Sequence, residues 1–303
     1  MATTNNRIKL PQASVINGVD AGGLMSASIQ AGFENVLQSA PDGLQVATVD
    51  REVQFVRGSI VTQDWVEMVN LLTGTVGSYV FYERKSGVAG ATGWIKHTLT
   101  APVIHSVRIT QSIRGFITCS FDFECRFAAE TTTLNDAWVI TDSQAAPTYI
   151  AAARGGYRVQ TTVHGATSIY HVTAFEFAMA IRMVKACNDA DLGYTCVDAD
   201  LEAGIACGGS ITCQDGSITT SQLLANKLLV AAKADLVITC TQSQGATAKV
   251  LTIANTAFTS QNENASPSSD FTPFALPFLV ANDPSTPLTV AGDNKIITIA
   301  NAT

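Results

Sequence analysis

The sequence predicts a mainly β protein with short flanking helices, in which two tandem domains of one plan each form a β-sandwich or half-barrel. The first observation is a repeated heptapeptide. Residues 58–64 (GSIVTQD) return as residues 209–215 (GSITCQD), with five of the seven positions identical. The second is that each copy follows a strand-like run and leads into a helix-like one. A repeat at half the chain length indicates two copies of one domain, which we place at residues 1–145 and 146–303.

Composition sets the broad class of the protein. Of its 303 residues, 47% are apolar and only 14% are charged, whereas about 25% is the usual charged share. A surface covered by Thr, Ser, Asn, Gln and Ala is typical of a protein that is buried mostly against copies of itself. The net charge of −7 argues against a basic groove for nucleic acid.

The seven cysteines include no C-x-x-C pair, and no histidine stands at zinc-finger spacing from them. We therefore expect reduced, mostly buried thiols in an intracellular assembly, with no metal and no cofactor. The polar start of the chain has no apolar segment of the signal-peptide type, and no apolar run approaches the roughly 20 residues of a membrane span. We expect neither a signal peptide nor a membrane span.

In the first half, alternation predicts a half-buried strand over residues 24–37. Its apolar side is expected to hold Met25, Ala27, Ile29, Ala31 and Phe33. A Pro-Asp-Gly turn at 41–43 and a second strand over 44–57 follow. Asp64 then suits a helix N-cap, and Trp65, Val66, Val69 and Leu72 form an apolar stripe at helical spacing.

A strand over residues 78–83 and a glycine-rich segment come next. The segment 86–93 contains Gly87, Gly90 and Gly93 and is expected to be an exposed hairpin tip. It lacks the Lys and Ser/Thr of a phosphate-binding loop, which argues against nucleotide binding.

The clearest strand of the chain covers residues 116–127. Its apolar face holds Ile117, Cys119, Phe121, Phe123, Cys125 and Phe127, and its polar face holds Thr118, Ser120, Asp122, Glu124 and Arg126. Two interpretations of the polar face stay open: simple solvent exposure, or the lining of an aqueous channel in which Asp122 and Glu124 supply negative charge.

Residues 129–155 form a polar connector, with a strand possible at 138–140, and the second half then repeats the plan. Alternation predicts a strand over 171–184 with a Phe and Met core face. An acidic group (Asp198, Asp200 and Glu202) lacks the spacing of a calcium loop. A helix over 219–233, strands at 236–241 and 249–254, a loop over 262–273 and strands at 278–280 and 295–300 complete the half.

No catalytic constellation stands out. The histidines (His97, His105, His164 and His171) show no H-E-x-x-H spacing, and no G-x-S-x-G elbow presents a serine. Asp122 and Glu124 could pair as carboxylates, but no cleft is indicated around them. The sequence therefore predicts a protein that is not an enzyme.

This arrangement of strands, one short helix and a glycine-rich hairpin in each half resembles the tail tube protein family of tailed bacteriophages. The resemblance lies in the strand–helix order around residues 59–74 and 210–233, in the two-faced strands and in the acidic balance. Most members of that family carry one such domain and form hexameric rings. A duplicated chain is similar to the variant in which three chains make a pseudo-hexameric ring.

The resemblance implies a structural virion protein of the tail, assembled in the host cytoplasm. Its rings would stack into a hollow tube, in part through the hairpin with Gly87, Gly90 and Gly93, and double-stranded DNA would pass without specific binding. The polar face from Thr118 to Arg126 would line the lumen. Sheath, tape-measure, baseplate and terminator proteins are the implied partners. The second half shows no clear counterpart of the Asp122 and Glu124 face, so its lumen strands stay open.

Two other classes compete with this interpretation. A capsid decoration or surface β protein would share the Thr- and Ala-rich composition but would form trimers or knobs rather than tubes. A carbohydrate-binding β module would need clustered exposed aromatic residues, yet the chain has only three tryptophans, and Trp65 belongs to a core stripe.

Overall fold

Antiparallel β-strands make up almost all of the regular structure in this computed structural model. It describes residues 10–16, 19–20, 23–39, 46–63, 65–66, 69, 77–84, 93–112, 115–127, 134–145, 156–186, 196–200, 206–214, 233–242, 247–260, 262–263, 273–281 and 295–301. Among these residues one short helix, α2 (Leu134–Ala137), is complete.

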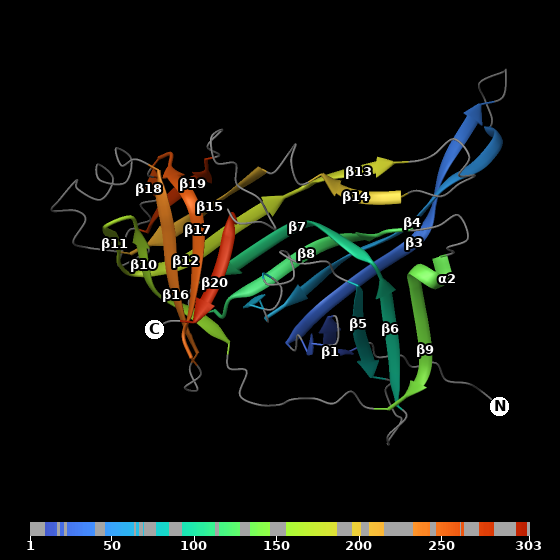
Figure 1. The fold of residues 1–303 in the computed structure, drawn as a ribbon, viewed down its shortest axis with the longest axis horizontal. Helices are drawn as coiled ribbons and strands as arrows, with labels where there is room; N and C mark the ends of the chain where they lie inside the picture. Colours follow the sequence, from blue (N-terminus) through green and yellow to red (C-terminus); the bar gives the residue numbers. More distant parts are fainter. Residues whose placement is uncertain are drawn as a thin grey trace.

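The largest sheet has 13 strands and runs through both halves of the chain (Figure 1). Its order is β11 (Thr167–Ile169), β10 (Tyr157–His164), β16 (Ala234–Gln242), β17 (Lys249–Phe258), β19 (Phe274–Val280), β15 (Ala206–Cys213), β12 (Val172–Ala180), β7 (Pro102–Gln111), β8 (Thr118–Cys125), β4 (Val46–Thr62) and β3 (Leu24–Ser39). Two further strands lie beside this path: β18 (Asn262–Glu263) pairs with β19, and β20 (Ile297–Asn301) pairs with β17.

The described residues also form two smaller sheets. The first has the order β2 (Val19–Asp20), β1 (Leu10–Ile16), β5 (Ser78–Arg84), β6 (Trp94–Thr100) and β9 (Trp138–Gln144). The second pairs β13 (Arg182–Ala186) with β14 (Cys196–Asp200). In Figure 1 the long β3–β4 hairpin extends past the rest of its half, and β13 and β14 prolong the β12–β15 hairpin in a similar way.

The two halves use the same scheme of strand pairing. In the first half the pairs are β1–β2, β1–β5, β5–β6, β6–β9, β3–β4, β4–β8 and β7–β8. In the second half the corresponding pairs are β10–β11, β10–β16, β16–β17, β17–β20, β12–β15, β15–β19 and β17–β19. In the second half one continuous strand, β17, occupies the places of β6 and of the start of β7.

Irregular positions recur as well. The register shifts between Leu24 and Ser26 in the first half and between Val172 and Ala174 in the second. Just outside these shifts, the Gln63 amide donates to the Gly23 carbonyl at 3.0 Å, and the Gln214 amide donates to the His171 carbonyl at 3.0 Å. These bulges and turns recur at equivalent backbone positions although the residues there differ. The similarity of the two halves therefore extends well beyond the heptapeptide.

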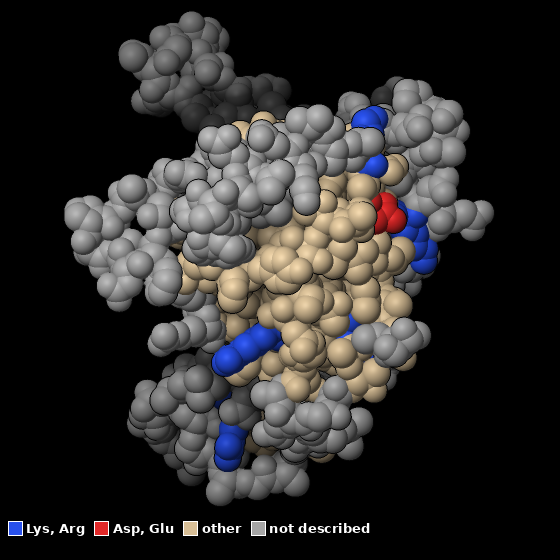
Figure 2. Space-filling model, turned by 90° about the vertical axis from the view of Figure 1, so that its left-hand side faces the viewer, with Lys and Arg blue, Asp and Glu red and all other residues tan. Residues whose placement is uncertain are grey.

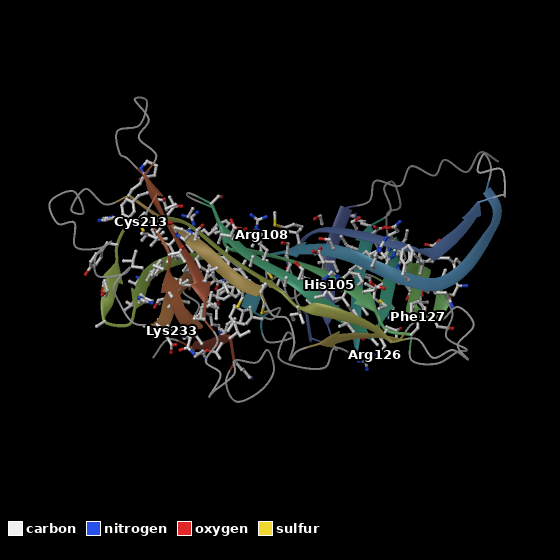
Figure 3. The ribbon with its side chains drawn as sticks, turned by 90° about the horizontal axis from the view of Figure 1, so that it is seen from above. His105, Arg108, Arg126, Phe127, Cys213 and Lys233 are labelled. Carbon is white, nitrogen blue, oxygen red and sulfur yellow. The ribbon has the colours of Figure 1, made fainter. Side chains whose placement is uncertain are left out.

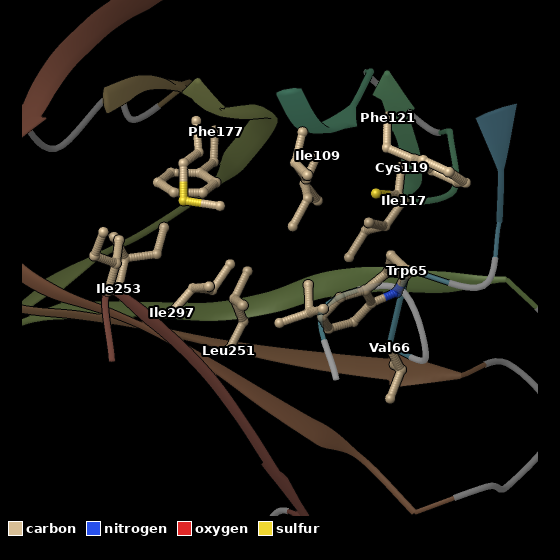
Figure 4. Close-up of a cluster of buried hydrophobic side chains, with 14 of the residues drawn as sticks. Trp65, Val66, Ile109, Ile117, Cys119, Phe121, Phe177, Leu251, Ile253 and Ile297 are labelled. Atoms are coloured by element: carbon tan, nitrogen blue, oxygen red, sulfur yellow. The ribbon is translucent and has the colours of Figure 1, made fainter. Parts of the chain in front are cut away.

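One hydrophobic core lies between the layers and crosses from one half into the other (Figure 4). Tyr79 of β5 meets Phe121 of β8 edge to face, with ring centroids 5.9 Å apart, so the five-stranded sheet packs on the first half of the large one. Trp65, which is fully buried, meets Tyr157 of the second half at 5.7 Å. Ring pairs of this kind add about 0.5–1.5 kcal/mol beyond area burial.

Several predictions from the pattern are confirmed. The strand expected over 116–127 is β8, and all six residues of its apolar face are buried. Phe175, Phe177, Met179 and Ile181 are buried in the same way in the second half. Trp65, Val66 and Val69 have helical backbone and are buried. The predictions of a helix beyond Val69, of a turn at 41–43 and of a helix over 219–232 fall outside the described residues, as does Glu202.

Two predictions are wrong. Met25, Ala31 and Phe33 do not belong to a buried face of β3, because all three are exposed, Met25 at 51% and Phe33 at 36%. Met25 sits in the bulge between Leu24 and Ser26, which turns it out of the alternation. The loop expected over 262–273 contains the two-residue strand β18, which pairs with β19.

Candidate functional site

The face of the large sheet opposite the core carries small and polar side chains. Residues directly opposite one another in neighbouring strands share a face, so the pairing defines rows across the sheet. One row joins Thr118, Thr110, Glu176, Ser210 and Pro277, and the next joins Ser120, Arg108, Ala178, Gly208 and Leu279. We call this surface the polar face. It is continuous from the first half into the second.

The charges described on the polar face nearly balance. Arg57 and Arg108 are basic, while Asp122, Glu124 and Glu176 are acidic. Arg108 and Glu176 form an ion pair at 2.8 Å across the junction of the two halves, and their side chains are 56% and 40% exposed. Figure 3 shows Arg108 near the middle of the elongated molecule. The end of the molecule seen in Figure 2 also shows few charged side chains among its described residues.

The structure places four of the five residues predicted for a channel lining on this surface, along β8: Thr118, Ser120, Asp122 and Glu124. The first three are half-buried. Arg126, also half-buried, follows the end of β8, and no strand pairing assigns it to this face. Glu124 differs from the expectation of an exposed carboxylate, because it is only 6% exposed. It lies between Arg57 of β4 and Val103 of β7, so neighbouring strands shield it. Asp122 is therefore the more accessible of the two carboxylates in this chain.

The glycines expected at a hairpin tip are placed only in part. Strands β5 and β6 pair from Ser78–Thr100 to Arg84–Trp94, so residues 85–93 do connect a hairpin. Gly87 and Gly90 lie outside the described residues. Gly93 is buried, so at this position the expected exposed tip does not hold.

A counterpart of the β8 face exists in the second half, although sequence comparison missed it. Strand β19 pairs with β15 as β8 pairs with β4, and Phe278 lies opposite Gly209 as Phe123 lies opposite Gly58. Pro277 and Leu279 therefore occupy the places of Asp122 and Glu124. Because both charges are replaced by apolar residues, only the backbone pairing reveals the correspondence.

A hollow of about 470 Å³ opens on the polar face where the halves meet. The β7–β8 turn and the starts of β3 and β12 border it, and its lining includes Met25, Phe116, Thr110, Ser210 and Glu176. Among the described residues of the lining, Glu176 is the only charged one, and it is paired with Arg108.

One histidine is buried in a network away from this surface. The indole nitrogen of Trp138 donates to Nδ1 of His97 at 3.3 Å, and Nε2 of His97 lies 3.2 Å from Glu83. The ring of Phe81 stacks on His97 with centroids 4.3 Å apart. Because the indole N–H needs an acceptor, Nδ1 is unprotonated and the neutral ring carries its proton on Nε2, toward the carboxylate. The network ties β5, β6 and β9 together.

The described residues contain no group of three or more His, Cys, Asp or Glu placed to hold a metal ion. Cys119, Cys125, Cys207, Cys213 and Cys240 form no disulfide bond. Burial raises the pKa of Cys119 and of Cys240 to about 12. Burial, and then the neighbouring Glu124 charge, raise the pKa of Cys125 to about 12. In the part of the chain that the structure describes, no helix combines the length and the apolar character of a membrane span.

The site thus consists of a long sheet surface with small side chains and balanced charges, joined across two halves of the same plan. None of the protein-family models compared with the chain matches it, and no curated protein matches its sequence.

Proposed function

We propose that this chain is a structural subunit of a bacteriophage tail tube, in which three chains form a pseudo-hexameric ring and stacked rings form a hollow conduit for DNA. One observation carries the proposal. Two four-stranded segments of the same pairing scheme, β3-β4-β8-β7 and β12-β15-β19-β17, are joined edge to edge through β7 and β12 into one sheet. A subunit that continues its own sheet in this way is suited to continue it into further subunits.

The joint between the segments is well supported by contacts. Six residue pairs from Phe175–Gln111 to Ala180–Ser106 connect β12 and β7. The Ile181 amide donates to the His105 carbonyl at 2.7 Å, and the Val159 amide donates to Oε1 of Gln111 at 2.7 Å. Beneath the joint, the buried Ile109 and Phe177 lie opposite each other (Figure 4). Three chains would bring six such segments into one closed barrel.

The polar face has the chemistry that a DNA conduit needs. Small neutral side chains give phosphates and bases few partners, and the two arginines are offset by three carboxylates. A protein that neutralises few phosphates releases few counterions and gains little affinity for DNA. The low density of charge, rather than a strongly acidic wall, is therefore what would let DNA slide in the proposed tube.

Negative-stain electron microscopy of the purified chain, before and after concentration, tests this function. Hollow tubes or stackable rings are expected, with end views of three-fold or pseudo-six-fold symmetry. Compact trimers that never stack would favour a capsid decoration protein instead. A monodisperse monomer at every concentration would contradict the proposal.

A further inference from the structure

Among the described residues, four strands of the large sheet pair on one side only, namely β3, β11, β18 and β20. Two of these edges, β3 and β18, end the two equivalent four-stranded segments. Strand β3 pairs only with β4, and β18 pairs only with β19. The edge of β3 is 16 residues long, and residues 24–33 carry no charged side chain. Free edges in natural sheets are usually short or guarded by charges, because an open edge is a template for pairing. This part of β3 has neither protection.

The corresponding edge in the second half is already occupied. Strand β12 is the counterpart of β3, since Phe177 lies opposite Gly209 as Ile29 lies opposite Gly58. The outer edge of β12 pairs with β7 inside the chain. The β7–β12 pairing therefore shows which kind of strand pairs with an edge like that of β3, and in which register.

The second free edge is the counterpart of β7. Phe258 lies opposite Phe278 as Ile104 lies opposite Phe123, and Asn262 lies opposite Ala275 as Arg108 lies opposite Ser120. At equivalent places, just before β7 and within β17, a residue has positive φ: 45° at Ala101 and 47° at Asn255. The Arg126 amide donates to the Ala101 carbonyl, and the Ala281 amide donates to the Asn255 carbonyl, both at 2.9 Å.

We propose that the β3 edge of one chain pairs antiparallel with residues 258–260 and 262–263 of a second copy, in the register of the internal β7–β12 joint. Gln30 then lies opposite Asn262 of the second copy, as Ala178 lies opposite Arg108, and Ile29 lies opposite Glu263, as Phe177 lies opposite Ile109. This inference rests on the proposed function, because it specifies the contact that closes the ring. It goes further by naming both edges and the register.

The contact is head to tail, because each chain has one edge of each kind. Such heterologous contacts close into rings when the rotation per copy allows it, and otherwise give open filaments. In the internal joint the ion pair between Arg108 and Glu176 adds to the pairing. The counterparts of these two residues, Asn262 and Ser28, are uncharged. The joint between chains therefore lacks a counterpart of this ion pair.

Engineered disulfides test the register. In the double variant Gln30→Cys/Asn262→Cys, mild oxidation of the assembled protein should produce covalent oligomers on non-reducing gels, ending at a closed trimer. The matched control is Ala178→Cys/Arg108→Cys, which should form the equivalent bond inside one chain and leave the mass monomeric. Cysteines whose Cα atoms lie more than about 7 Å apart do not bridge without backbone movement, so Gln30→Cys/Ser260→Cys, two residues out of register, should bridge poorly. Each single-cysteine variant shows the background from native thiols.

The outcomes separate this inference from the proposed function. One outcome overturns only the register. In that outcome rings are visible and the internal control forms its disulfide, but the Gln30/Asn262 pair forms none, or the out-of-register pair forms one more readily. The tube function then stands. Covalent trimers that never stack would support the edge pairing and contradict the tube. A protein that forms the internal bridge yet neither assembles nor links between chains would overturn both.

Discussion

At the scale of single residues, Gly58 and Gly209 explain why the heptapeptide begins with glycine in both halves. A β-carbon at Gly58 would clash with the carbonyl oxygen of Ser28 on the facing strand, and one at Gly209 would clash with that of Glu176. The same added atom would lie 3.0 Å from Cζ of Phe123, or 2.7 Å from Cζ of Phe278. A backbone oxygen and a packed ring leave no room for a side chain, so the repeat records a packing constraint.

Gly58→Ala and Gly209→Ala are therefore expected to lower the free energy of unfolding by about 1–3 kcal/mol each, the usual cost of overpacking. Urea denaturation measures the change. Ser59→Ala is the matched control, because Ser59 points to the polar face; a surface change of this kind stays within about 0.5 kcal/mol. Equal midpoints for Gly58→Ala and Ser59→Ala would contradict the packing explanation.

The buried thiols lead us to predict how the stability of the protein depends on pH. The pKa values of Cys119, Cys125 and Cys240 rise from an ordinary 9.0 to about 12 in the folded chain. Unfolded thiols therefore lose their protons first as pH rises. The stability that these groups contribute is complete below about pH 9 and is lost progressively as pH rises from there toward about 12.

Alkylation with iodoacetamide at pH 8, followed by mass spectrometry, checks the protection of these thiols. Cys119 and Cys240 should react far more slowly in the native protein than in urea, because the thiolate is the nucleophile. Cys207 is half-buried, and burial raises its pKa only to about 11, so it should react before them. Equal native and unfolded rates for Cys119 would contradict its burial.

At the scale of elements, the joint between β7 and β12 is held by its core side more than by its ion pair. Phe177→Ala should cost about 3–5 kcal/mol, because a fully buried ring is removed. Arg108→Ala removes a half-exposed ion pair and should cost less than about 1 kcal/mol. Thermal or urea unfolding of both variants measures the contrast. A larger loss for Arg108→Ala than for Phe177→Ala would show that charge, not packing, joins the halves.

Sequence patterns predict those elements whose two faces differ in polarity. The alternation from Ile117 to Phe127 locates β8 and its buried face because a strand with one buried side has a fixed register. The same rule fails at Met25, because a bulge breaks the period of two. It also fails at Glu124, because the shielding comes from strands that are distant in sequence. Local patterns carry no information about either effect.

The counterpart of the β8 face shows a further limit of sequence patterns. Pro277 and Leu279 share nothing chemically with Asp122 and Glu124, so no residue comparison relates β19 to β8. Their equivalence rests on hydrogen-bonded pairing with β15 and β4. The joint of β7 with β12 is likewise a long-range pairing, which the alternation of either strand cannot specify.

At the scale of the whole molecule, the continuous sheet and its β3 and β18 edges are the basis of the proposed assembly. A chain that holds two segments of one plan and exposes one edge of each kind should close a ring with half as many subunits as a single-domain protein would need. The central claim is therefore that a ring contains three chains and six similar segments.

Averaged end views of the assembled particles by cryo-electron microscopy, combined with the native mass of the smallest ring, test that claim most directly. We expect three-fold symmetry with six similar lobes around an open centre, and a ring mass of three times the 31.9 kDa chain. A ring of six chains, or particles without a central opening, would contradict it.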